Sequence, residues 1–130
     1  MRMLYDVWDF ARALGVVKVG VKTSQEHVDL YEKLVKEEYQ EFIDAPTDVN
    51  KLQEAMDLIW VLLGYCICRG WGVIGAWRAV RDANMAKIQL DPATGELHRR
   101  SDGKILKPDG WQKPNLAPFL NGEIQHKDNE

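Results

Sequence analysis

Apolar side chains recur at intervals of three and four residues in four successive stretches of the chain, which is the spacing of amphipathic helices. Thr23 and Glu26 have the spacing of a capping box, and Asp48 is expected to cap the helix that follows Pro46. Gly70 is expected to end that helix in a left-handed conformation. The pattern predicts an all-α fold with helices over about residues 4–14, 24–44, 49–69 and 73–88.

Two other stretches lack helical spacing. Residues 15–23 alternate apolar residues with lysine or glycine, which predicts a loop or one short strand. Residues 91–121 are polar and rich in turn-forming residues, which is typical of an irregular tail. Within this tail, residues 97–100 and 104–106 flank a Ser-Asp-Gly turn and predict a small β-hairpin.

The size and charge of the chain fit one compact domain. It has 130 residues, with 17 basic and 20 acidic side chains and a formal net charge of −3. A chain of this length buries roughly two thirds of its unfolded surface, so it can build a core without disulfides or a structural metal. We expect one domain over residues 1–121 and a polar tail at 122–130. The slightly acidic balance, without a run of like charges, argues against nucleic acid as a partner.

The longest strongly apolar run covers residues 58–68. Its 11 residues are too few for a membrane span, which needs about 20, so we expect a buried core helix and no membrane partner. Because this run is apolar on all sides, four helices in one chain leave it uncovered, and a second copy of the chain is expected to bury it. Asp6 and Asp9 interrupt the N-terminal region where a signal peptide needs apolar residues, which favours a cytoplasmic protein.

Carboxylates interrupt the apolar stripe of the second predicted helix. Tyr31, Leu34 and Phe42 lie on this stripe, Glu38 lies at its centre, and Glu41 lies at its edge. Two carboxylates are therefore expected to point inward. A buried carboxylate without a partner costs several kcal/mol, so the sequence must supply a cation or keep the group protonated.

The third predicted helix repeats the pattern with Glu54 and Asp57, again three residues apart. Two such pairs on consecutive antiparallel helices would bring four carboxylates together. Ligands that are all oxygen select hard cations, so the pattern predicts a site for Mg²⁺ or Mn²⁺. The alternative is that these are ordinary surface acids neutralised by lysines such as Lys33, Lys36 and Lys51.

Cationic residues that suit phosphate oxygens follow the carboxylates. The fourth predicted helix carries a polar stripe at every third position: Arg78, Arg81, Asn84 and Lys87. The tail adds a cationic and aromatic segment that is expected to fold over a bound nucleotide: Lys104, Lys107, Trp111 and Lys113. Alternatively, the stripe is a solvated helix face and the segment is a surface tail.

The spacing Glu38-x-x-Glu41, twelve residues, Glu54-x-x-Asp57 and then Asn84-x-x-Lys87 resembles the all-α nucleoside triphosphate pyrophosphohydrolases. This MazG-like group includes phosphoribosyl-ATP pyrophosphohydrolase and the dimeric dUTPases. Residues 82–87 and 102–107 are similar to segments of its short bacterial and phage members, and the resemblance covers about residues 1–120.

The resemblance implies a four-helix bundle completed by a homo-oligomer, either a dimer or a dimer-of-dimers tetramer. It implies Mg²⁺ or Mn²⁺ on the four carboxylates, with Glu38 or Glu41 as the catalytic base. The residues expected to contact a nucleoside triphosphate substrate are Arg81, Asn84, Lys87, Lys104, Lys107 and Trp111.

The reaction implied is cleavage of a nucleoside triphosphate to the monophosphate and pyrophosphate. A phage branch of the family acts on dGTP, which makes dGTP and then GTP the expected substrates, in the host cytoplasm if the protein is phage-encoded. Candidate groups for stacking on a purine are Trp8, Phe10, Trp60 and Trp111, while residues 15–23 or Asp9 would read the guanine edge.

Other functions stay open on sequence alone. Within the same fold, the alternatives are a dUTPase or dCTPase type of enzyme and phosphoribosyl-ATP pyrophosphohydrolase. A non-enzymatic helical interaction module would need no metal. A di-iron bundle needs a Glu-x-x-His pair on each of two helices, whereas only Glu123-x-x-His126 fits, in the polar tail.

Overall fold

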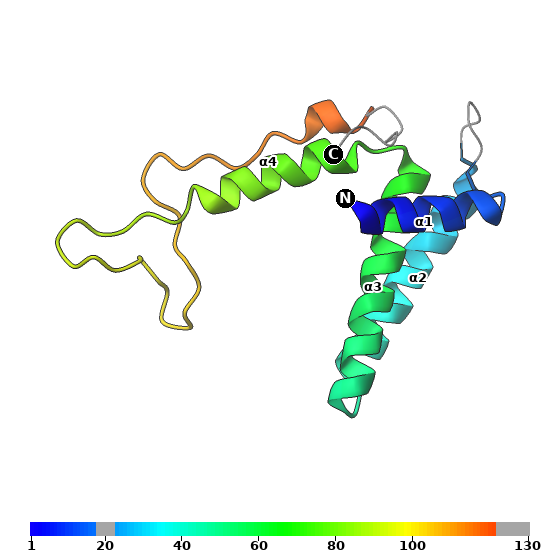
Figure 1. Cartoon of the computed structure of the whole chain (residues 1–130), viewed down its shortest axis with the longest axis horizontal. Coiled ribbons are helices and arrows are strands. Elements are labelled where there is room, and N and C mark those ends of the chain that lie inside the picture. Colours follow the sequence, from blue (N-terminus) through cyan, green and yellow to red (C-terminus); the bar gives the residue numbers. More distant parts are fainter. Residues whose placement is uncertain (18–22, 122–130) are drawn as a thin grey trace.

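The computed structural model describes residues 1–17 and 23–121 of the chain. This part holds four α-helices and no assigned strand, which confirms the all-α fold (Figure 1). The helices are α1 (Arg2–Ala13), α2 (Gln25–Asp44), α3 (Asp48–Arg69) and α4 (Val73–Met85), followed by a short 3-10 helix, η1 (Ala117–Phe119). Most of the predicted 15–23 connection, and all of the predicted polar tail at 122–130, lie outside the described residues.

The caps of α2 and α3 each lie one residue away from the predicted position. The hydroxyl of Ser24 accepts a hydrogen bond from the backbone N–H of His27, so Ser24 caps α2 and the capping box predicted at Thr23 was wrong. The hydroxyl of Thr47 accepts from the N–H of Asn50 at 3.2 Å and caps α3. Asp48 instead lies in the first turn of α3, where its carboxylate faces the positive end of the helix dipole.

The ends of α3 and α4 differ in how well they were predicted. Gly70 ends α3 in the predicted left-handed conformation, with a φ of 70°. Helix α4 ends at Met85 and not at residue 88. The N–H groups of Lys87 and Ile88 bond to carbonyls three residues back, at 3.1 and 3.0 Å, so the chain tightens into a turn there.

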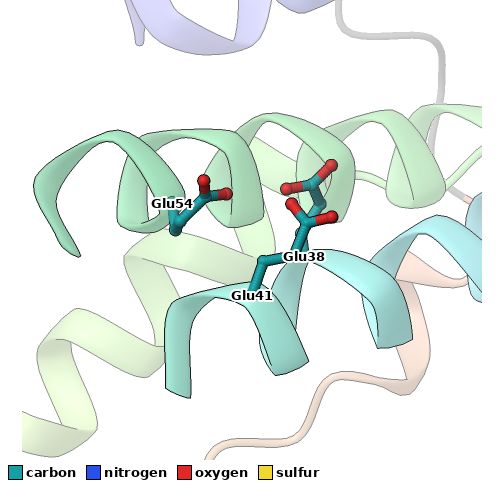
Figure 2. Close-up of side chains that lie close together, drawn as sticks. All are labelled: Glu38, Glu41 and Glu54. Atoms are coloured by element: carbon teal, nitrogen blue, oxygen red, sulfur yellow. The ribbon is translucent and has the colours of Figure 1, made fainter. Parts of the chain in front are cut away.

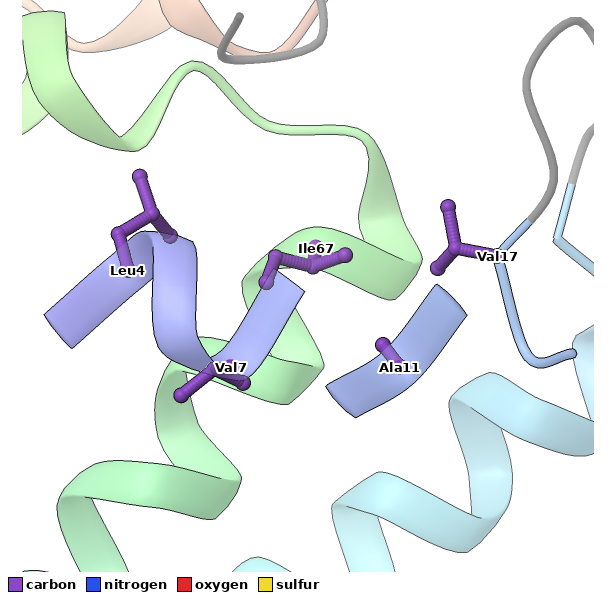
Figure 3. Packing of buried hydrophobic residues seen from close by; sticks show 5 residues of the cluster. All are labelled: Leu4, Val7, Ala11, Val17 and Ile67. Atoms are coloured by element: carbon purple, nitrogen blue, oxygen red, sulfur yellow. The ribbon is translucent and has the colours of Figure 1, made fainter. Parts of the chain in front are cut away.

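Helices α2 and α3 form an antiparallel hairpin, and α1 lies across its open end (Figure 1). Three residues of α1 form the main core with Ile67 of α3, together with Val17 (Figure 3). The residues of α1 in this core are Leu4, Val7 and Ala11. A second buried cluster of Val28, Tyr31 and Cys68 lies between α2 and α3.

Helix α4 leads away from this hairpin, and the tail returns along it (Figure 1). The indole N–H of Trp111 donates to the carbonyl of Ala83 at 2.6 Å, and the carbonyl of Phe119 accepts from the N–H of Gly72 at 2.7 Å. The region of the predicted β-hairpin holds an isolated antiparallel bridge between Arg99 and Ile105. A true hairpin there stays a prediction.

The apolar helix α3 is not covered on all sides within one chain. Ile59, Trp60 and Leu62 are 38%, 37% and 43% exposed, so the expected burial of residues 58–68 does not come from α1 and α2 alone. On α4, Trp77 and Met85 are 59% and 60% exposed. Among the residues that the structure describes, no helix has the length and apolar character needed to cross a membrane.

Candidate metal centre

Three carboxylates from two helices converge between α2 and α3. Glu38 and Glu41 project from α2 and Glu54 projects from α3, and their carboxylate groups point toward one another (Figure 2). One oxygen from each residue lies within 4.8 Å of the others. The Glu38–Glu41 pair of α2 therefore meets Glu54 of the second predicted pair across the hairpin.

Two carboxylates of the cluster, those of Glu38 and Glu54, have raised pKa values. Burial, followed by the charge and hydrogen bonding of Glu41, raises the pKa of Glu38 to about 7, and the charges of Asp57 and Glu54 add to the shift. The pKa of Glu54 is also raised, first by burial and then by its hydrogen bond with Glu41 and the charge of that residue. Without a cation, the cluster therefore holds a proton that isolated carboxylates would release.

Two oxygens in the cluster lack any partner. Oε2 of Glu38 and Oε2 of Glu54 are both inaccessible to solvent and accept no hydrogen bond in the described part of the chain. Buried polar atoms are nearly always hydrogen-bonded, so two such oxygens without a partner in one carboxylate cluster are unusual. A hard divalent cation ligated by carboxylate oxygens would satisfy both atoms, and the donor set fits Mg²⁺ or Mn²⁺.

The nearby lysines are engaged elsewhere. Lys33 pairs with Glu37 and Lys36 pairs with Glu32, each at 3.9 Å on the exposed side of α2. Lys51 donates to carbonyl oxygens at the end of α2. None of the ion pairs within residues 1–17 and 23–121 includes a carboxylate of the cluster. Among the described residues, none of these three lysines therefore pairs directly with a carboxylate of the cluster.

Asp57 and Glu41 differ from their predicted positions. Asp57 lies outside the 4.8 Å group and accepts two hydrogen bonds from the side-chain amide of Gln53, each 3.1 Å long. Gln53 was not predicted from the sequence, although its i,i+4 spacing from Asp57 is a readable signal. Glu41 is exposed and not buried as predicted, although one of its carboxylate oxygens lies within 4.8 Å of those of Glu38 and Glu54.

Four of the six predicted substrate contacts form a second group, here called the cationic cluster: Asn84, Lys87, Lys107 and Trp111. Lys87 donates to the side-chain oxygen of Asn84 at 2.9 Å, and the ammonium groups of Lys87 and Lys107 lie 4.9 and 5.1 Å from the centroid of the Trp111 ring. Neither lysine has an acidic partner among the described residues. The cluster therefore carries two unneutralised positive charges.

Arg81 and Lys104 are not brought into the cationic cluster. The guanidinium of Arg81 binds the carboxylate of its neighbour Asp82 at 2.9 Å. The main-chain N–H of Lys104 donates to Asp102 in the tail turn. In addition, α4 does not pack along the α2–α3 hairpin, so the cationic cluster and the carboxylates lie apart in one chain (Figure 1).

The predicted stacking groups have different surroundings. Phe10 of α1 and Trp60 of α3 meet edge to face, with ring centroids 5.4 Å apart, and both remain more than a third exposed. Trp8 is partly buried and packs against the main core. Asp9 is exposed. Residues 15–23, which were predicted to read the guanine edge, lie mostly outside the described residues.

Comparison with protein-family models and with curated proteins finds no match to the chain.

Proposed function

We propose that this protein is a Mg²⁺- or Mn²⁺-dependent nucleoside triphosphate pyrophosphohydrolase. The observation that carries the proposal is the convergence of Glu38, Glu41 and Glu54 within 4.8 Å, with two buried oxygens left unpartnered. Asp57 is the fourth ligand that we assign from the sequence motif, although its carboxylate lies outside the group of three and accepts hydrogen bonds from Gln53. The motif resemblance supports the same assignment.

The side chains divide the chemistry between them. When bound at the carboxylates, Mg²⁺ or Mn²⁺ would neutralise charge on the phosphoryl oxygens and lower the pKa of water. Glu38 or Glu41 accepts the proton of the attacking water as general base. Lys87 and Lys107 bind the triphosphate through charge-assisted hydrogen bonds, and Asn84 holds the Lys87 ammonium in place. The leaving group is pyrophosphate, and the nucleoside monophosphate is the second product.

A homo-oligomer, dimer or dimer of dimers, completes the proposed enzyme. The exposed apolar side chains of α3 and α4 would be buried against another copy of the chain. The cationic cluster, which is separated from the carboxylates of its own chain, would approach the carboxylates of that second copy. Light scattering is expected to show a dimer or tetramer at micromolar concentration, and a monomer would contradict this part of the proposal.

For the substrate, we propose a purine deoxynucleoside triphosphate, dGTP first and GTP next. The exposed edge-to-face pair of Phe10 and Trp60 supports this choice, because large aromatic faces favour the wider π surface of a purine. A site with acceptors for the guanine N1–H and amino group rejects dATP, since those acceptors would be left unpaired. The base preference itself rests on the family resemblance.

The experiment is a panel assay of pyrophosphate release with Mg²⁺, Mn²⁺ or a chelator. The substrates are dGTP, GTP, dATP, dUTP, dCTP and phosphoribosyl-ATP. We expect metal-dependent release that is fastest with dGTP. A tenfold preference for dUTP, dCTP or phosphoribosyl-ATP would overturn the base assignment alone. Absence of release from every nucleotide would favour the non-enzymatic interaction module.

A further inference from the structure

A tyrosine ring of α2 lies directly against a glycine of α3. A Cβ atom added to Gly64 would lie 2.2 Å from Cε1 and 2.9 Å from Cδ1 of Tyr31. The Tyr31 side chain is only 5% exposed, so its ring has little room to move aside. Gly64 is itself buried. The ring of Tyr31 packs directly against the backbone of Gly64, and this contact therefore sets the distance between the two helices at this point.

This contact belongs to the same helix seam as the carboxylates. Seven residues along each helix, taken in opposite directions, lead from Tyr31 and Gly64 to Glu38 and Asp57. Because the two helices are antiparallel, the Tyr31–Gly64 pair and the Glu38–Asp57 pair form two layers of one interface. The layers lie roughly 10 Å apart along the helix axis. Leu34, which packs against the cluster that contains Tyr31, lies between the two layers on α2.

We propose that Tyr31 and Gly64 are positioning residues that fix the α2–α3 distance at the metal site. The inference rests on the proposed metal-binding function. Closely packed interiors transmit strain, so a change of spacing at the Tyr31 layer reaches the carboxylate layer. Mg²⁺ requires ligands at 2.0–2.1 Å in near-ideal geometry, whereas Ca²⁺ accepts 2.3–2.6 Å and irregular geometry. The contact therefore selects the smaller ion.

The test is calorimetric titration of the full chain with Mg²⁺ and with Ca²⁺, which needs no nucleotide. Gly64→Ala pushes a methyl group into the Tyr31 ring and is expected to weaken Mg²⁺ binding about tenfold, with Ca²⁺ binding much less affected. The matched control is Gly75→Ala in α4, because its Cβ would lie 2.4 Å from Cε1 of Phe119. That clash is of the same kind but lies away from the carboxylates, so both ion affinities are expected to stay at wild-type values.

A second pair of variants covers the case in which Gly64→Ala does not fold. Tyr31→Leu removes the ring without creating a clash, and it is expected to reduce the preference for Mg²⁺ over Ca²⁺. Combining it with Gly64→Ala makes room for the methyl group, so the double variant is expected to recover part of the Mg²⁺ affinity.

The outcomes separate this inference from the proposed function. A wild-type protein that binds neither ion overturns the metal site and the positioning role together. A wild-type protein that binds Mg²⁺, with Gly64→Ala and Tyr31→Leu both unchanged in ion preference, overturns the positioning role alone. Equal losses of Mg²⁺ affinity in Gly64→Ala and Gly75→Ala would also overturn the positioning role, because the loss would then reflect a general decrease in stability.

Discussion

Lys51 of α3 donates its ammonium group to the carbonyl oxygen of Phe42 and lies 4.7 Å from the centroid of the same residue's ring. It also donates to the carbonyl of Ile43 at 3.2 Å. These carbonyls belong to the last turn of α2, where no further helical N–H is available. Lys51 thus closes the hairpin and satisfies the end of α2. Its charge does not pair with the carboxylate cluster.

Lys51→Met is expected to lower the free energy of unfolding by about 1–2 kcal/mol, because the carbonyls lose a charged donor. Mn²⁺ affinity is expected to stay close to wild type, since this lysine does not neutralise the cluster. Chemical denaturation and calorimetry measure the two effects. Lys36→Met is the control, because its exposed pair with Glu32 contributes little. Much tighter Mn²⁺ binding in Lys51→Met would contradict this role for Lys51.

Metal removal is expected to lower the melting temperature. The carboxylates of the cluster repel one another without a cation, and an ion that binds only the folded state stabilises it by mass action. Chelator-treated protein should recover on addition of millimolar Mg²⁺ or Mn²⁺. The triple variant Glu38→Gln, Glu41→Gln, Glu54→Gln is expected to melt at a higher temperature than the chelator-treated wild type. Added metal is expected to leave its melting temperature unchanged. A wild-type melting temperature that ignores metal would argue for the interaction-module alternative.

The metal-free protein is expected to lose stability as pH rises from about 4.5 to about 7. The pKa of Glu38 is near 7 in the folded chain and near 4.5 when it is unperturbed, so between these values the folded state binds more protons than the unfolded state. The raised pKa of Glu54 acts in the same direction. Thermal melts in chelator across this pH range measure the effect. Glu38→Gln should flatten the slope, and an unchanged slope would contradict the assignment.

Loss of either lysine of the cationic cluster is expected to weaken nucleotide binding about tenfold, because each supplies a charge-assisted hydrogen bond to phosphate. Trp111→Phe keeps a ring under the two ammonium groups but loses the bond to Ala83, so it should cost less than Trp111→Ala. KM for dGTP at two salt concentrations measures the effects. Lys36→Met, on the exposed side of α2, is the control. Equal KM values in Lys36→Met, Lys87→Met and Lys107→Met would remove the cluster from the substrate site.

The helices were predictable because their apolar spacing is local information. The caps were each misplaced by one residue, since Thr23 and Ser24, or Thr47 and Asp48, are neighbours that can both cap a helix. The end of α4 was misplaced because Ile88 continues the apolar stripe beyond Met85, where the helix ends. The local spacing of apolar residues therefore predicts the type of each element better than the residues at which the element begins and ends.

The carboxylate site was predictable because the α2–α3 hairpin that carries its residues was predictable. Three-residue spacing on two antiparallel helices brings Glu38, Glu41 and Glu54 together without any long-range information. The position of the cationic cluster was not predictable in this way, because it depends on the direction α4 takes after Gly72 and on the return of the tail to Ala83. Both are long-range features that no spacing along the chain encodes.

The most direct test of the central claim is ³¹P NMR of dGTP incubated with Mg²⁺ and the wild-type protein, beside the Glu38→Gln variant. We predict resonances of dGMP and pyrophosphate with the wild type, none in the presence of chelator, and a rate at least about 100-fold lower for Glu38→Gln. Release of dGDP and inorganic phosphate, or a Glu38→Gln variant as fast as the wild type, would contradict the account.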